Sequence, residues 1–144
     1  MNPVWANEIY IGTELSSGQT PTWTYSKLCA GIESVSFASN EQNQQYFFLC
    51  GNGFAHNEVT GAAPALTISG RRKKGDTAQD YIVGKQFALG ADRNTSVKII
   101  AEGKQIICDA TIGDVVSFGG NTLDVNNFGC TIYLNGQPTV TDVT

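Results

Sequence analysis

The side chains best suited to chemistry in this 144-residue chain are a run of cations, a lone histidine and four cysteines. The cations, Arg71 to Lys74, have the composition of a phosphate- or nucleic-acid-binding run. They are four of nine basic residues, so the rest of the chain has five cations against thirteen carboxylates, a net charge of −8. A single basic turn on an acidic body is a poor nucleic-acid site. We therefore interpret the run as a loop that is solvated or paired with a partner.

The histidine, His56, has an acid close by in Glu58. A catalytic triad also needs a nucleophile, and no serine or cysteine is marked as one. Gly51-Asn52-Gly53 begins like a dinucleotide fingerprint, but a third glycine and a following helix are missing. The sequence therefore predicts no catalytic residue, no cofactor and no enzymatic activity.

The four cysteines are Cys29, Cys50, Cys108 and Cys130. No two of them form a Cys-x-x-Cys pair, and one histidine cannot complete a zinc set with them, so we expect no metal site. All but Cys29 lie in apolar runs, which predicts small buried thiols, with a disulfide pair as the alternative.

A helix over residues 76–89 must hold the basic run in place. Asp76 has the residue type of an N-cap, and Gln79 completes a capping-box pattern. Asp76 and Asp80 also compensate the helix dipole. Gly90 lies where a left-handed residue would end the helix. The predicted inward face consists of Ala78, Tyr81, Ile82 and Leu89.

The rest of the chain alternates apolar and polar residues, as half-buried strands do. We expect a mainly β fold, an antiparallel β-sandwich or barrel with one flanking helix. Residues 16–22 are predicted to be a loop, 113–114 a bulge and 119–121 a hairpin turn, and 135–138 should end the last strand. The inward residues of the last two strands should be Ile106, Cys108, Ala110, Ile112, Val116, Phe118, Phe128, Cys130, Ile132 and Leu134.

Residues 40–61 have the pattern of a projecting arm. Five polar residues are followed by an apolar run, Tyr46 to Cys50, in which both faces of an extended chain are apolar. In a single subunit one of these faces has little to cover it, and exposed apolar patches of this kind usually mark interaction sites. The candidate inter-subunit contacts are Tyr46, Phe47, Phe48, Leu49, Arg71, Arg72, Lys73 and Lys74.

The composition is compatible with self-assembly, because a surface poor in charge is often partly covered by another molecule. Charged residues are only 15% of the chain, below the usual quarter, while hydrophobic residues are 41%. Residues 1–144 are long enough for one domain with a sizeable core. The first residues have neither the basic start nor the apolar run of a signal peptide, and no stretch is apolar enough to span a membrane. The sequence thus predicts a protein made in a cytoplasm, without membrane contact.

The segment from Ser69 to Ile82, SGRRKKGDTAQDYI, resembles the central part of tail tube (major tail) proteins of long-tailed bacteriophages and prophages of Gram-positive bacteria. Supporting pieces are residues 39–41, 59–61, 119–120 and 135–138. The resemblance implies hexameric rings that stack into a hollow conduit through which DNA passes without specific binding. It implies a subunit of the virion tail, assembled in the host cytoplasm, with the tape measure protein and tail completion proteins as partners.

A β-sandwich ligand-binding module is the alternative. Three aromatic residues could stack on the sugar rings of a carbohydrate. They are Trp5, Trp23 and Tyr25.

Overall fold

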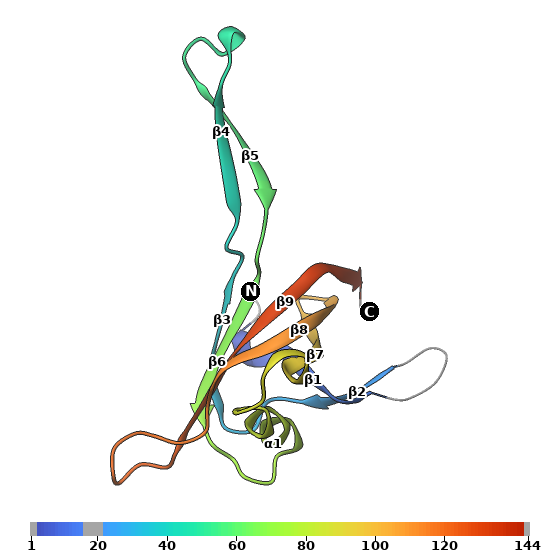
Figure 1. Ribbon diagram of the computed structural model, residues 1–144, viewed down its shortest axis with the longest axis vertical. Helices are drawn as coiled ribbons and strands as arrows, with labels where there is room; N and C mark the ends of the chain where they lie inside the picture. The colour runs from blue at the N-terminus through green and yellow to red at the C-terminus, as the bar shows by residue number, and fades with distance from the viewer. Residues whose placement is uncertain (1–2, 16–21, 143–144) are drawn as a thin grey trace.

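The computed structural model describes residues 3–15 and 22–142 and shows a β-rich body from which one long hairpin projects (Figure 1). The body is a seven-stranded antiparallel sheet with the strand order β2-β1-β7-β8-β9-β6-β3. These strands are β1 (Glu8–Leu15), β2 (Trp23–Lys27), β3 (Ile32–Ala38), β6 (Ala65–Arg71), β7 (Asn94–Ala101), β8 (Lys104–Val116) and β9 (Asn127–Asp142).

The alternation of β8 and β9 places one side of the sheet in the core. Phe128, Cys130, Ile132 and Leu134 of β9 are all buried, as the sequence predicts, while Tyr133 faces outward. Cys108, Ala110 and Ile112 of β8 are also buried. The mainly β, antiparallel fold with a single flanking helix is thereby confirmed.

The connection between β8 and β9 differs from the expected hairpin turn. The register shifts between Gly113 and Val116, which confirms the bulge, and Asp114 has a positive φ of 50°. Residues 117–126 then form a loop rather than a tight turn, so Val116 and Phe118 are exposed instead of inward. The reason is that ladder pairing resumes after the bulge for one pair only: Val116 pairs with Gly129, and the chain beyond Val116 leaves the sheet.

The last strand does not end at residues 135–138. β9 continues to Asp142, because a second register shift, between Ile107 and Asp109 of β8, accommodates an insertion around Gly136 (φ 77°). Beyond it, β9 pairs again with the start of β8. Residues 16–21, most of the predicted 16–22 loop, lie outside the described residues.

The helix α1 (Thr77–Gly84) begins where the sequence predicts. The Asp76 side chain caps it by accepting a hydrogen bond of 3.2 Å from the Gln79 backbone N–H. Ala78 and Ile82 are buried in the core. The helix ends at Gly84, however, not at residue 89. Gln86 hydrogen-bonds Ser117 at 2.9 Å and holds the following segment against the end of β8.

Two short 3-10 turns in the body complete this part of the fold, η1 (Val4–Ala6) and η3 (Gly90–Arg93). Gly90 has the predicted positive φ of 66°, but it starts η3 rather than ending α1. No helix in the described part of the chain is long and apolar enough to cross a membrane.

The hairpin consists of β4 (Gln42–Phe47) and β5 (Ala55–Gly61), joined through the 3-10 turn η2 (Leu49–Gly51). It prolongs the β3–β6 ribbon away from the body (Figure 1). At its root, Asn40 has a φ of 49° and donates a side-chain hydrogen bond of 3.0 Å to the Ala63 carbonyl oxygen. The backbone N–H of Ala63 in turn donates to Ser39. We call residues 40–63 the arm.

Candidate assembly surfaces

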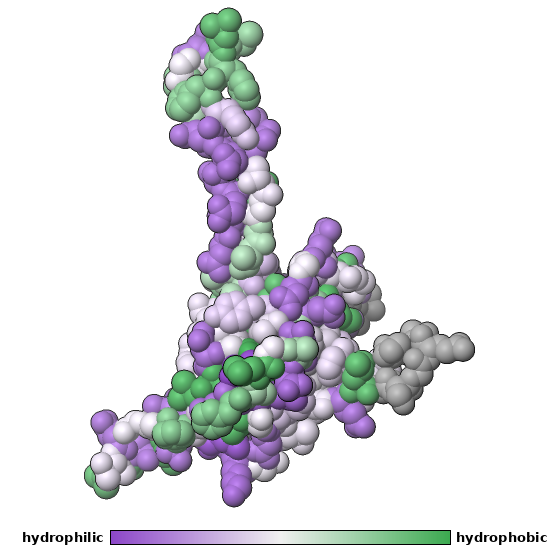
Figure 2. All heavy atoms as spheres, viewed as in Figure 1, coloured by the Kyte–Doolittle hydropathy of each residue, from purple (hydrophilic) through white to green (hydrophobic). Residues whose placement is uncertain are grey.

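The arm has a polar stem and an apolar tip. Every residue of β4 is exposed, since the hairpin has only two strands and nothing in the described part of the chain covers either face. The stem strand β4 begins with Gln, Asn, Gln, Gln, whereas green hydrophobic side chains crowd the far end in Figure 2. The exposed fractions of the large tip side chains are 68% for Phe47, 57% for Phe48, 100% for Leu49 and 79% for Phe54.

Local contacts give the tip a defined shape. The Tyr46 and Phe48 rings stack with centroids 5.9 Å apart, and Phe48 also lies 5.9 Å from the His56 ring. Asn52 and Gly53 adopt positive φ values of 52° and 85°, which close the turn. The predicted burial of Cys50 is wrong: it lies in η2 at the tip, where its side chain is exposed. The apolar run from Tyr46 to Cys50 is therefore left exposed by the described part of the chain.

The basic run lies at the end of the body opposite the arm (Figure 1). Two of its four cations are paired within the chain. Arg71 bonds Glu33 at 3.0 Å, and Arg72 bonds Asp80 at 2.6 Å. The Arg72 hydrogen bond lowers the pKa of the Asp80 carboxyl.

The buried side chain of Gln79 organises this loop. Its amide donates hydrogen bonds to the Ala30 carbonyl at 2.6 Å and the Arg71 carbonyl at 3.1 Å. Its oxygen accepts one from the Lys73 backbone N–H at 2.8 Å. Gln79 thus completes no capping box, because its side chain turns away from Asp76 to tie the loop together.

The other two cations of the run are differently placed. Lys73 and Lys74 have no ion pair among residues 3–15 and 22–142. They are therefore the two members of the run whose charge remains for an external partner.

A second exposed apolar area lies around the β8–β9 loop. The predicted inward positions Leu89 and Phe118 are both exposed here, because the helix ends early and β8 ends at its bulge. Gln86 donates a hydrogen bond to the Val115 carbonyl oxygen and accepts one from the Ser117 hydroxyl, and these two bonds hold the segments side by side. The exposed side chains of these segments are Phe87, Leu89, Val116, Phe118, Leu123 and Val125.

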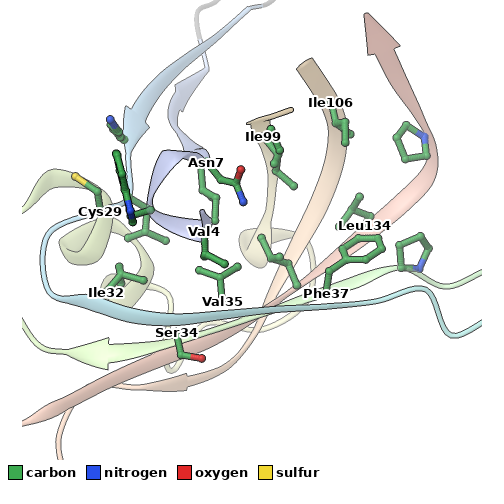
Figure 3. Close-up of a pocket in the computed structure, with 18 of the residues that line it drawn as sticks. Val4, Asn7, Cys29, Ile32, Ser34, Val35, Phe37, Ile99, Ile106 and Leu134 are labelled. Carbon is green, nitrogen blue, oxygen red and sulfur yellow. The ribbon is translucent and has the colours of Figure 1, made fainter. Parts of the chain in front are cut away.

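An open apolar cavity of about 710 Å³ lies on the side of the body where the arm is rooted. Figure 3 shows Val35 and Phe37 of β3 facing Ile99, Ile106 and Leu134 of the strands opposite. The sheet therefore curls until its edge strand lies across from its central strands. Sequence reasoning missed the cavity, because its walls come from segments far apart in the chain.

The two buried thiols are held in the protonated form, and the lone histidine lies apart from them. Burial raises the pKa of Cys130 to about 12 and also raises that of Cys108, so both thiols stay protonated at neutral pH. His56 lies on β5 with its imidazole 3.4 Å from Glu58, away from either buried thiol. Within the described ranges, no group of three or more metal-ligating side chains occurs.

The aromatic residues of the carbohydrate alternative are mostly engaged in the fold. The Trp23 ring packs over Gly12, where an added Cβ would lie 2.7 Å from it. The Tyr25 hydroxyl is 2.9 Å from the Ser96 hydroxyl, and its ring lies under the Lys98 ammonium. Trp5 alone is largely exposed, at the edge of the cavity.

Comparison with known proteins yields matches in structure but not in sequence. No protein-family model and no curated protein matches the sequence. A chain in the virion of a native gene transfer agent particle superposes with a TM-score of 0.74 at 11% identity, over 98% of this chain and 99% of that one. A chain in the C6-symmetric tail of an empty gene transfer agent particle gives a TM-score of 0.70 at 13% identity, with the same coverage of both chains.

A third match comes from a different kind of particle. It is a chain of the sheath–tube complex of PVC, an extracellular contractile injection system, in its extended state. The TM-score is 0.60 at 14% identity, over 98% of this chain and 91% of that one. The fold defined above is thus the tail tube-like fold that recurs in tail and injection particles. Structural matches at sequence identities this low establish the fold, but not membership of a particular protein family.

Proposed function

We propose that this protein is the structural subunit of a phage-type tail tube, in which hexameric rings stack into a hollow conduit for DNA. The observation that carries the proposal is the arm, an uncovered apolar tip on a polar stem. Full-length likeness to a chain of a C6-symmetric tail supports six-fold rings. In this role the protein has no catalytic residue, and the arm is the element that joins subunits along the tube.

The charge distribution supports a conduit that DNA can slide through. Clustered cations would bind phosphates and slow passage, so the inner wall should be neutral to acidic. Outside the run Arg71–Lys74 the chain has a net charge of −8. Within the run, Glu33 and Asp80 already neutralise both arginines. We place this loop away from the channel, with Lys73 and Lys74 directed to acidic groups of a neighbouring subunit.

The proposed setting is a virion tail assembled in the cytoplasm of a bacterial host. The further partners would be the tape measure protein and the tail completion proteins, with DNA as passing cargo rather than a bound ligand. A Gram-positive host and a long-tailed phage remain part of this proposal on the strength of the sequence resemblance.

Replacement of the arm tests the proposal. The native protein should form rings or tubes in negative-stain electron microscopy. Exchange of residues 42–54 for a short Gly-Ser linker should leave a subunit folded by circular dichroism that forms no tubes, since no described body strand depends on the arm. His56→Ala is the matched control and should leave the tubes intact. Featureless native monomers, or normal tubes from the shortened protein, would contradict the proposal.

A further inference from the structure

We propose that the arm tip of one copy, residues 46–55, inserts into the apolar cavity of a second copy of the same chain. The inference deepens the proposed function, on which it rests, by naming the surface that receives the arm. The cavity is the one lined by β3 and the strands opposite it (Figure 3).

The cavity needs an apolar occupant. Its floor includes buried core residues, Ile9, Leu66 and Leu134, and its walls include Val35 and Ile106. Water in such a space would find few of the polar partners that a buried water requires. Cavities of about 300–1,000 Å³ hold drug-sized apolar ligands, and this one, at about 710 Å³, has room for several large side chains.

Charge at the rim does not oppose an uncharged occupant. The two charged residues that line the cavity are already paired, Lys27 with Glu8 at 3.2 Å and Glu33 with Arg71 at 3.0 Å. The tip segment, YFFLCGNGFA, has no charged residue at all. Insertion therefore buries no unpaired charge. An unpaired buried charge would strongly disfavour such a contact.

The tip cannot reach the cavity of its own chain. Phe37 lines the cavity, and the chain runs on from it into the arm. At about 3.3 Å per residue, the segment from Phe37 to Phe47 spans roughly 33 Å. The paired strands β4 and β5 and the hydrogen bonds at the root, from Asn40 and Ala63, direct that length away from the body. Only another copy can present its cavity to the tip.

The symmetry of such a contact suits a stack. Tip and cavity are different surfaces of one chain, so each copy gives one contact and receives one. Heterologous contacts of this kind do not close a pair of copies but continue from copy to copy. The polar stem then sets the distance between the joined bodies.

Two native cysteines allow a direct test. Cys50 lies in the tip and Cys29 at the edge of the cavity, and both are exposed, whereas the other two cysteines are buried. A flexible bismaleimide added to the assembled protein should link Cys50 of one copy to Cys29 of the next. Because every copy carries both thiols, denaturing gels should show a ladder of multimers. Cys29→Ser and Cys50→Ser should each abolish the ladder.

The outcomes separate this inference from the proposed function. Assembled protein that yields only monomers or dimers would overturn the inference, since dimers arise when like cysteines meet, while the tail tube proposal would stand. Native protein that never assembles would count against the proposed function itself, and with it the inference.

A charge exchange gives a second readout that does not depend on thiols. Phe37→Glu places a carboxylate on the cavity wall, and Leu49→Lys places an ammonium on the tip. Both native side chains are exposed, so each variant should fold. Each change alone should raise the assembly threshold at least tenfold, and the double variant should recover most of the loss. Normal assembly of Phe37→Glu, or no recovery in the double variant, would overturn the inference.

Discussion

Leu49→Asp at the arm tip is the sharpest single perturbation of assembly. The Leu49 side chain is 100% exposed in the subunit, so the change should leave the free energy of unfolding within about 0.5 kcal/mol of native. In the assembly the same side chain would be covered. The variant therefore separates folding from association.

The magnitude follows from the exposed fractions at the tip. Burying a large apolar side chain contributes roughly 1.5–3 kcal/mol. Phe47, Phe48, Leu49 and Phe54 are between 57% and 100% exposed, so covering all four contributes on the order of 4–9 kcal/mol per contact. Leu49→Asp removes its own share, about 1.5–3 kcal/mol, before any cost of burying a carboxylate.

The assay is the critical concentration for assembly, measured by sedimentation of polymer across a concentration series. At about 1.4 kcal/mol per tenfold change, Leu49→Asp should raise this concentration roughly 10- to 100-fold. Leu49→Met is the matched control and should assemble like the native protein, because it conserves apolar volume. An unchanged critical concentration for Leu49→Asp would refute burial of the tip.

Three further predictions concern the subunit itself. Asp80→Asn should lower the melting temperature at pH 7. Because Arg72 lowers the carboxyl pKa, the ion pair's stabilisation is present above the ordinary value of 3.8 and is lost as pH falls through the folded value, so thermal scans in acid should show the difference vanishing. Phe128→Ala should cost about 3–5 kcal/mol in urea unfolding, since Phe128 is only 1% exposed; a loss below 1 kcal/mol would mean that the core is arranged otherwise. A thiol reagent should modify Cys29 and Cys50 in the native subunit and all four cysteines after denaturation; equal native rates for all four would contradict the burial described.

Local sequence determined the parts of the fold that depend on near neighbours along the chain. The alternation of Phe128, Cys130, Ile132 and Leu134 placed one face of β9 in the core, because successive strand residues point to opposite sides. Asp76 fixed the start of α1, since an N-cap needs only a side chain that accepts a hydrogen bond from the backbone N–H three residues later. The apolar tip was also visible as a run that no single face could cover.

Tertiary structure decided everything that depends on which element covers which. Leu89 and Phe118 have apolar side chains in register with buried faces, yet both are exposed, because α1 ends early and β8 stops at its bulge. Gln79 fits a capping box in sequence, but its side chain hydrogen-bonds backbone groups of Ala30, Arg71 and Lys73, which the fold brings close to it. The cavity has no local signature at all: its walls come from both ends of the chain and meet only when the sheet curls. A side chain is buried only when another element packs against its face of the strand or helix. The periodicity of apolar residues shows only which face could be buried.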